Sequence, residues 1–503
     1  MSDCEKHRRW IPEVDLWLTI LALAVGALVI VLAVQPAHGQ TYQVIHTFSG
    51  SDGSSPIYGL TPDQGGNLYG VAEYGGASHG VVFKLTHAHS GWVLNPLYEF
   101  RGGADGATPH AGVVFGHDGV LYGTTVFGGN QGESECVGGC GVVFSLRPQP
   151  TRPPTPLSPW LEKPLYAFNL FNDGNSPYSG VTFDQAGNMY GTTFLGGGGC
   201  CDGTVYELQP SGGGWAKSTV HSFVGGDNDG LEPIAGVTLD KSGNLYGVTI
   251  GGGPGDWGVV YELSPYGSGW TESLLYIFQN NGLDGAGPYG GLIFDNAGNI
   301  FGTTTVGGQG FGGTVFELSP SNGGWKFKVL YSFPGGNGPH DKLTMDAAGN
   351  LYIETNGRIR KVSSDGIITT LAGGGTAAVG AVGLPAIQVQ LSSPSGVAVD
   401  QNGNCFIADG QWVRKVSAAG TLTTLAGNGN WDFSGDGGPA TKAAVEGVYS
   451  VAVDFSGTVY FADASNNLFG ACRRPGSSRR SLAMDSRVRP AMVDRRSVAN
   501  SIP

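Results

Sequence analysis

The sequence predicts an all-β protein made of about eight four-stranded units arranged in a ring. Three observations support this prediction. A phrase such as FDQAGNMYGTTFLGGGG (183–199) returns eight times along the chain. Each return lies among short strand-like segments that are bounded by Gly, Asp, Asn or Pro. The composition combines 88 Gly and only 13% charged residues with 40% hydrophobic residues, which suits many tight turns around a sizeable core.

The first forty residues have the features of an export signal. A basic cluster at 6–9 precedes an uncharged apolar run, Leu16 to Val34, and the small-residue pattern Ala37-His38-Gly39 follows. The run is also long enough to span a bilayer, so residues 1–40 are either a cleaved signal peptide or an N-terminal membrane anchor. In both cases we expect the rest of the chain to be extracytoplasmic, secreted or held in the cell envelope.

The repeated phrase has a nearly constant period. Its turn glycines are separated by 53, 68, 56, 55, 51, 54 and 54 residues, which lies just above the periods of kelch and WD40 repeats. Their positions are Gly66, Gly119, Gly187, Gly243, Gly298, Gly349, Gly403 and Gly457.

One unit shows the expected strands, namely GVTLD (236–240), NLYGVTI (244–250), GVVYELSP (258–265) and WTESLLYIF (270–278). The first two are joined by Asp-x-x-Gly-Asn, in which Asp can hydrogen-bond the turn and Gly can adopt a positive φ. Four antiparallel strands in about 54 residues form one blade of a β-propeller. The Pro-rich insertion 147–159 accounts for the single 68-residue interval, and we place it between the third and fourth strands of its unit.

Both ends of the chain bear on how the ring closes. The segment YQVIHTFSG (42–50) matches the fourth strands, so it should complete the last blade and remove exposed sheet edges. That last blade shows only VAVDFSG and VYFADAS, and we expect its third strand to be missing. Residues 468–503 carry eight Arg and two Asp, lack the repeated phrase, and are predicted to be a disordered basic tail from a truncated or frame-shifted end.

The charge distribution argues against nucleic-acid binding. The formal net charge is −13, and because the tail contributes +6, the remainder carries −19. An acidic surface repels a phosphate backbone, so we expect no nucleic-acid partner.

The first five units, with GNLYGVAEYGGASHGVVFKL (66–85) and GNIFGTTTVGGQG (298–310), resemble the GloVer tandem repeats of bacterial surface and secreted proteins. The last three, with NGRIRKVSSDGIITTLAGGG (356–375), resemble NHL repeats. The resemblance implies GloVer-like blades over 41–340 and NHL-like blades over 341–467. It implies binding or scaffolding more than activity, although some NHL-like propellers are lyases or lactonases, so function has to be argued from a site.

Two sets of loops are expected on one end of the ring. The first is the Gly-rich set at 73–80, 127–141, 195–203, 251–258 and 307–313, which either admits a ligand to the backbone or only makes tight turns. The second repeats Asp-Gly-x-x-Pro between blades, with its acids at Asp52, Asp105, Asp173, Asp229 and Asp284. These carboxylates either bind calcium or, since each lies in a separate blade, stabilise their own turns.

The best candidates for ligand contact follow the prolines of the second loop set, where the chain should line the rim of the central channel. They are His110, Tyr178, Tyr289 and His340, with Ile57 and Ile234 at equivalent positions. The alternative to ligand binding is that these side chains plug the channel.

Cysteine usage fits an exported protein. Cys136 and Cys140 lie in the same class of loop as Cys200 and Cys201 of the next blade, so these four are disulfide candidates in an oxidising compartment. A metal cluster is the other interpretation of the four.

No nucleophile elbow, HExxH motif, P-loop or dinucleotide fingerprint occurs in the chain. The sequence therefore favours a non-enzymatic extracytoplasmic scaffold that binds a glycan, peptide or protein, with no catalytic residues and no required cofactor. The alternative is an NHL-like lyase or hydrolase with a metal held in the channel by His110, His340 and nearby carboxylates. Calcium on the loops is the other cofactor considered.

Overall fold

The computed structural model describes residues 41–473, apart from 57–58, 89–90, 131–135, 150–159, 170–172, 199–201, 336–337, 339–342, 356, 432–433, 436–437, 455–456 and 464. The predicted signal or anchor (1–40) and the tail from 474 onward lie outside the described residues. Within the described part, no helix is long and apolar enough to cross a membrane.

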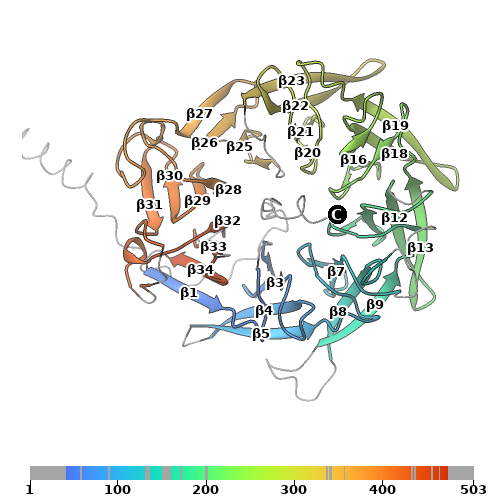
Figure 1. The fold of residues 1–503 in the computed structure, drawn as a ribbon, viewed down its shortest axis with the longest axis horizontal. Coiled ribbons are helices and arrows are strands. Elements are labelled where there is room, and N and C mark those ends of the chain that lie inside the picture. Colours follow the sequence, from blue (N-terminus) through green and yellow to red (C-terminus); the bar gives the residue numbers. More distant parts are fainter. Residues whose placement is uncertain are drawn as a thin grey trace, which may run out of the picture.

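Eight four-stranded antiparallel sheets stand around a central axis and form a closed ring (Figure 1), which confirms the predicted propeller. We number the blades 1 to 8 in chain order. Within each blade the four strands follow one another outward from the axis, and in blade 8 the outermost strand comes from the N-terminal side of the chain.

The first strands have two residues in blades 1 to 6 and six in blades 7 and 8, whereas every second strand has five. The first strands are β2 (Thr61–Pro62), β6 (Val114–Phe115), β10 (Thr182–Phe183), β15 (Thr238–Leu239), β20 (Ile293–Phe294), β24 (Thr344–Met345), β28 (Pro394–Val399) and β32 (Val448–Val453). The second strands are β3 (Leu68–Ala72), β7 (Leu121–Thr125), β11 (Met189–Thr193), β16 (Leu245–Thr249), β21 (Ile300–Thr304), β25 (Leu351–Thr355), β29 (Cys405–Asp409) and β33 (Val459–Asp463).

The outer layers are longer in blades 1 to 5. The third strands are β4 (Val81–Ala88), β8 (Val142–Pro148), β12 (Thr204–Ser211), β18 (Val259–Tyr266), β22 (Phe311–Ser321), β26 (Arg358–Val362), β30 (Trp412–Val416) and β34 (Leu468–Arg473). The fourth strands are β5 (Gly91–Glu99), β9 (Trp160–Ala167), β13 (Gly214–Ser222), β19 (Gly269–Ile277), β23 (Gly324–Pro334), β27 (Ile368–Gly373), β31 (Leu422–Ala426) and β1 (Thr41–Thr47). Short pieces in the loops are β14 (Gly230–Leu231), β17 (Gly251–Gly252), η1 (Ala386–Gln388) and η2 (Ala440–Lys442).

The Asp-x-x-Gly-Asn phrase forms the turn between the first and second strands, as predicted. In blade 1, Asp63 Oδ1 accepts the backbone N–H of Asn67 at 2.8 Å and Oδ2 accepts its side-chain amide at 2.7 Å. Gly66 has a φ of +75°, a conformation that costs glycine little. The repeated phrase therefore encodes a hairpin turn.

The glycine two residues into the second strand has a packing role. In blade 3, Gly191 pairs with Tyr206 on the third strand, and a Cβ on Gly191 would lie within 3 Å of that ring. The same cross-strand pair of a glycine and an aromatic residue recurs in the other GloVer-like blades, as Gly70–Phe83, Gly123–Phe144, Gly247–Tyr261 and Gly302–Phe316. The aromatic ring fills the space that the missing side chain leaves.

The hydrophobic core is divided among the seams between blades. At five of the seams a phenylalanine just after the fourth strand packs edge-on against the third-strand aromatic of the next blade, as Phe100 does on Phe144 with ring centroids 5.1 Å apart. The fourth-strand tryptophans cross the same seams in the other direction, as Trp270 does to Tyr190 at 5.9 Å. Each blade is therefore held by its neighbours, which is typical of repeat architectures.

The ring closes through a complete last blade, which corrects one expectation. Strand β34 pairs with β33 on one side and with β1 on the other, so the third strand of blade 8 is present (Figure 1). The predicted boundary at residue 468 is wrong, because 468–473 belong to the sheet. The repeat was hard to read here because the cross-strand pair is reversed, with Phe461 on the second strand and Gly470 on the third.

One other placement follows the prediction. The Pro-rich insertion lies between the third and fourth strands of blade 2, with β8 ending at Pro148 and β9 beginning at Trp160. The expected division of the repeats at residue 340 stays a prediction.

Candidate functional site: the loop face of the ring

One end of the ring carries the most varied loops. Because neighbouring strands are antiparallel, the loops between second and third strands and the connections between blades all lie at the same end. We call this end the loop face. The opposite end carries the short turns between first and second and between third and fourth strands.

The Gly-rich loops of this face are held by backbone bridges. In blade 1, Ser54 of the entering connection forms an antiparallel bridge with Tyr74 of the loop between the second and third strands. The same bridge recurs as Ala107–Phe127, Asn175–Leu195 and Ala286–Val306, and as the β14–β17 pair in blade 4. Positions of the loops are thus fixed by paired backbone, despite their glycine content.

A residue with a left-handed backbone joins each of these blades to its predecessor. The N–H of Thr108 donates to the carbonyl of His79 in blade 1 at 2.8 Å, and its carbonyl accepts from Val126 of its own blade at 3.1 Å. Its φ is +58°, which is costly for a β-branched residue. Equivalent positions hold Ser55, Ser176, Glu232 and Gly287, with φ between 55° and 60°.

The aspartates of the Asp-Gly-x-x-Pro connections bind their own turns. Asp284 accepts the backbone N–H of Gln279 at 2.8 Å and the phenol of Tyr276 at 3.0 Å. Asp105 similarly accepts the N–H of Arg101 and the phenol of Tyr98, each at 2.9 Å. This geometry matches the turn-stabilising interpretation. The five carboxylates belong to five separate connections and not to one shared calcium site.

The channel-rim candidates are only partly brought together. His110 is buried, at 4% exposure, and its ring meets Tyr178 edge-on with centroids 5.0 Å apart. Tyr178 in turn contacts the ring of Phe194 at 5.6 Å. Tyr289 lies two blades further along the ring, and His340 and Ile57 lie outside the described residues. The described geometry thus makes His110 and Tyr178 an aromatic packing pair at the blade 2–3 seam.

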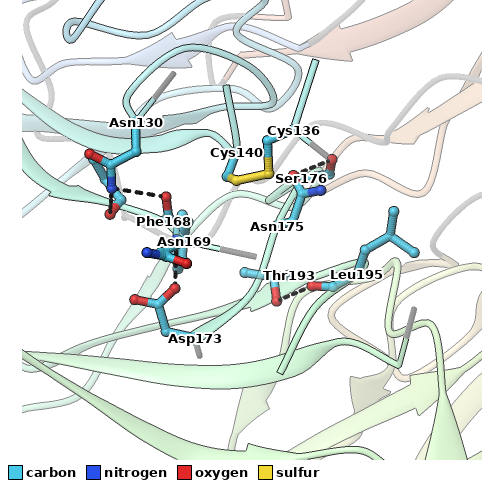
Figure 2. The surroundings of a disulfide bond; sticks show 11 residues. Asn130, Cys136, Cys140, Phe168, Asn169, Asp173, Asn175, Ser176, Thr193 and Leu195 are labelled. Atoms are coloured by element: carbon cyan, nitrogen blue, oxygen red, sulfur yellow. Dashed lines mark hydrogen bonds between the residues drawn. A yellow bond between two sulfur atoms is a disulfide. The ribbon is translucent and has the colours of Figure 1, made fainter. Parts of the chain in front are cut away.

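A disulfide braces the loop face beside blade 3 (Figure 2). Cys136 and Cys140, both buried, are bonded with Cα atoms 5.3 Å apart. The carbonyl of Cys140 accepts the N–H of Ser176 at 3.0 Å, so the bonded loop is tied to the connection that enters blade 3. Cys200 and Cys201 lie outside the described residues, while Cys405 and Cys472 are buried free thiols.

Exposed apolar side chains gather on the loop face, a feature that the sequence interpretation missed. Of seventeen exposed large hydrophobic residues in the described part of the chain, nine lie there. They include Tyr74 at 49% and Phe311 at 74% exposure, and the others are Phe127, Val137, Val224, Trp257, Leu283, Val306 and Trp431. The signal was the bulky residue just before Gly-Gly, as in EYGG and VFGG, which the emphasis on glycine obscured.

The fold and this face define a β-propeller repeat protein. The profile of the Gloeobacter/Verrucomicrobia repeat matches residues 28–229, 135–359 and 197–404, and the chain belongs to that family. The match includes all five GloVer-like blades. The NHL-like character of the last three blades stays a prediction.

Solved structures with a similar fold are distant. An auxiliary nutrient binding protein from Bacteroides ovatus is 14% identical with a TM-score of 0.35, and the match covers 83% of this chain and 96% of that one. A nutrient binding protein from Bacteroides thetaiotaomicron is 12% identical with a TM-score of 0.34, covering 86% and 97%. The WD40 β-propeller domain of Doa1 is 12% identical with a TM-score of 0.39, covering 87% and 98%. Likenesses at this level say nothing about ligand or activity, and no curated protein sequence matches the chain.

Proposed function

We propose that this protein is an extracytoplasmic binding scaffold without catalytic activity, which presents its loop face to a glycan, peptide or protein. The observation that supports this proposal is the gathering of exposed Tyr, Phe, Trp and aliphatic side chains on that face. Exposed apolar groups of this kind, above all aromatic ones, are enriched at recognition surfaces. The bridged loops fix their positions, so little ordering entropy is lost on binding.

The extracytoplasmic location is supported by two features. The apolar run Leu16 to Val34, followed by Ala37-His38-Gly39, is typical of an export signal. The Cys136–Cys140 disulfide suits an oxidising compartment. Cell fractionation with an antibody to the chain would test this part: recovery in the cytoplasm would contradict it.

The alternative, a lyase or hydrolase with a channel metal, has less support. It requires His110 to be a free ligand, whereas the buried imidazole packs against Tyr178. No described observation favours this alternative over the scaffold.

The binding proposal can be tested with purified protein on a glycan array and against a displayed library of random peptides. For any probe that is retained, the double variant Tyr74→Ser/Phe127→Ser should weaken affinity at least about tenfold, because aromatic anchors carry much of the energy of such surfaces. Tyr266→Ser is the matched control, since Tyr266 is 77% exposed on the opposite face. Unchanged affinity in the double variant, or an equal loss in the control, would overturn the assignment of the loop face.

A further inference from the structure

Three potential metal ligands meet at the seam between blades 3 and 4, away from the channel. His221 is on β13, Asp229 is in the connection that follows this strand, and Glu272 is on β19 of blade 4. Their ligand atoms all lie within 4.8 Å of one another, and this is the one such group in the described part of the chain. His221 Nε2 is 3.2 Å from Asp229 Oδ1 and 3.6 Å from Glu272 Oε1.

The repeats show that this combination is particular to one seam. The position of His221 is occupied by Tyr98, Tyr166 and Tyr276 in blades 1, 2 and 4, and by His46 on β1. The position of Glu272 is occupied by Leu94, Glu162, Lys217 and Phe327 in the other GloVer-like blades. The seam between blades 3 and 4 alone among these combines an imidazole with two carboxylates.

At the seam between blades 2 and 3, a lysine occupies the position that Glu272 has at the seam between blades 3 and 4. Lys217 Nζ lies 3.3 Å from the carbonyl oxygen of Asp173 and 5.7 Å from the ring centroid of Tyr166. A protein cation thus occupies the position next to the turn of Asp173. At the next seam the equivalent side chain is Glu272, and the basic group that faces it and Asp229 is the His221 imidazole.

One carboxylate oxygen at the His221 seam lacks a hydrogen bond. Glu272 Oε1 is buried and accepts no hydrogen bond from the described residues, and His221 Nε2 lies 3.6 Å away. A buried carboxylate oxygen that lacks a hydrogen bond is costly, so a bound cation would stabilise this arrangement.

The geometry suits zinc. Zn²⁺ binds His nitrogen and carboxylate oxygen at about 2.0–2.2 Å, which places neighbouring ligand atoms of a tetrahedral site about 3.3 Å apart. The 3.2 and 3.6 Å separations are close to that value. Calcium would require six to eight oxygen ligands and does not favour imidazole.

We propose that His221 Nε2, Asp229 and Glu272 bind one zinc ion, with solvent as the fourth ligand, and that this ion clamps blade 3 to blade 4. Asp229 is oriented for the role by the N–H groups of Val224 and Gly230, which its two carboxylate oxygens accept, each at 2.7 Å. The side chains of His221 and Glu272 are 21% and 15% exposed, which leaves a path for the ion. A ligand that binds the folded state alone raises stability in proportion to the logarithm of its concentration.

The test is zinc titration of the purified, chelator-treated protein by calorimetry, with Co²⁺ as a spectroscopic substitute. The native protein should take up one equivalent, show the visible bands of four-coordinate Co²⁺, and gain thermal stability with zinc. His221→Tyr installs the residue of the neighbouring blades, so it should fold normally but lose at least about tenfold in affinity, with Glu272→Gln behaving alike. Glu162→Gln, at the equivalent position of blade 2, should bind zinc as the native protein does.

Two results would overturn the proposal. One is a native protein that takes up no zinc at a 1:1 ratio. The other is a pair of variants, His221→Tyr and Glu272→Gln, that fold as judged by circular dichroism and bind zinc as tightly as the native protein. Ligand binding at the loop face is a separate property. Whether the His221 and Glu272 variants keep or lose it says nothing about the zinc site.

Discussion

The phenol of Tyr276 donates a hydrogen bond of 3.0 Å to Asp284, and this contact ties the outermost strand of blade 4 to the connection that enters blade 5. Asp284 is buried and also accepts the N–H groups of Gln279 and Asn281. An aspartate with a phenol or imidazole partner recurs at the three preceding seams, as Asp105 with Tyr98, Asp173 with Tyr166 and Asp229 with His221. The connection between blades therefore repeats its own set of hydrogen bonds.

Asp284→Ala should therefore destabilise the protein by about 1–3 kcal/mol, because two backbone donors and a phenol lose their acceptor in a buried turn. Tyr276→Phe, which leaves the carboxylate and its backbone partners in place, should cost only about 0.5–1.5 kcal/mol. Urea denaturation followed by tryptophan fluorescence measures both. Equal effects of the two variants would show that the backbone contacts of Asp284 contribute little.

Tyr206→Phe should leave stability unchanged or raise it by about 1–3 kcal/mol, since the buried Tyr206 hydroxyl has no hydrogen-bond partner among the described residues. Blades 1, 2 and 5 already hold Phe at this position, as Phe83, Phe144 and Phe316. Gly191→Ala is the opposing variant, because its Cβ would lie within 3 Å of the Tyr206 ring and should cost about 1–3 kcal/mol. A marked loss of stability in Tyr206→Phe would mean that the hydroxyl has a stabilising partner.

Thr108→Gly should raise the free energy of unfolding by about 1 kcal/mol, because glycine adopts the +58° φ of this position without the steric cost of a β-branched side chain. Gly287 occupies the equivalent place in blade 5 with a φ of +59°, and Gly287→Ala should have the opposite sign. Denaturant midpoints of the two variants provide the check. Destabilisation by Thr108→Gly would assign a packing role to the threonine side chain.

Glu162 should make stability fall as the pH rises. Burial and the charge of Asp105 raise the pKa of Glu162 from 4.5 to about 8, and Tyr98 and Arg101 also face this seam. The unfolded chain loses this proton near pH 4.5 while the folded chain keeps it, so the contribution is fully present below pH 4.5 and is lost as the pH rises through 8.

Urea midpoints of native protein and Glu162→Gln, measured from pH 4 to pH 9, test this expectation. The variant should be relatively more stable at the high end, with a flatter dependence. Glu99→Gln, on the exposed side of the neighbouring strand β5, is the control and should follow the native profile. Parallel curves for native protein and Glu162→Gln would show that this carboxyl is not perturbed.

The sequence predicted the structure correctly where a residue interacts only with its near neighbours in the chain. Asp63 and Gly66 make their turn with partners within four residues, so the pattern alone predicted the hairpin. The fourth-strand match of the segment after residue 41 likewise predicted ring closure, which the β1–β34 pairing confirms. The prediction for blade 8 was wrong because the aromatic residue, Phe461, lies on the second strand and the glycine, Gly470, on the third, the reverse of the GloVer-like blades. Such a reversed pair is recognised only once the two strands are seen side by side.

By itself the sequence determined the repeat, the turns and the ring. These depend on local backbone preferences and on the alternation of apolar and polar residues along each strand, and both recur in every unit. Only the tertiary structure decided what the blades place together: the apolar side chains of the loop face, and His221, Asp229 and Glu272 at one seam. Asp229 and Glu272 are 43 residues apart in the chain, and their meeting depends on the lateral packing of two blades. Contacts between repeats follow from the geometry of the closed ring, which no single repeat contains.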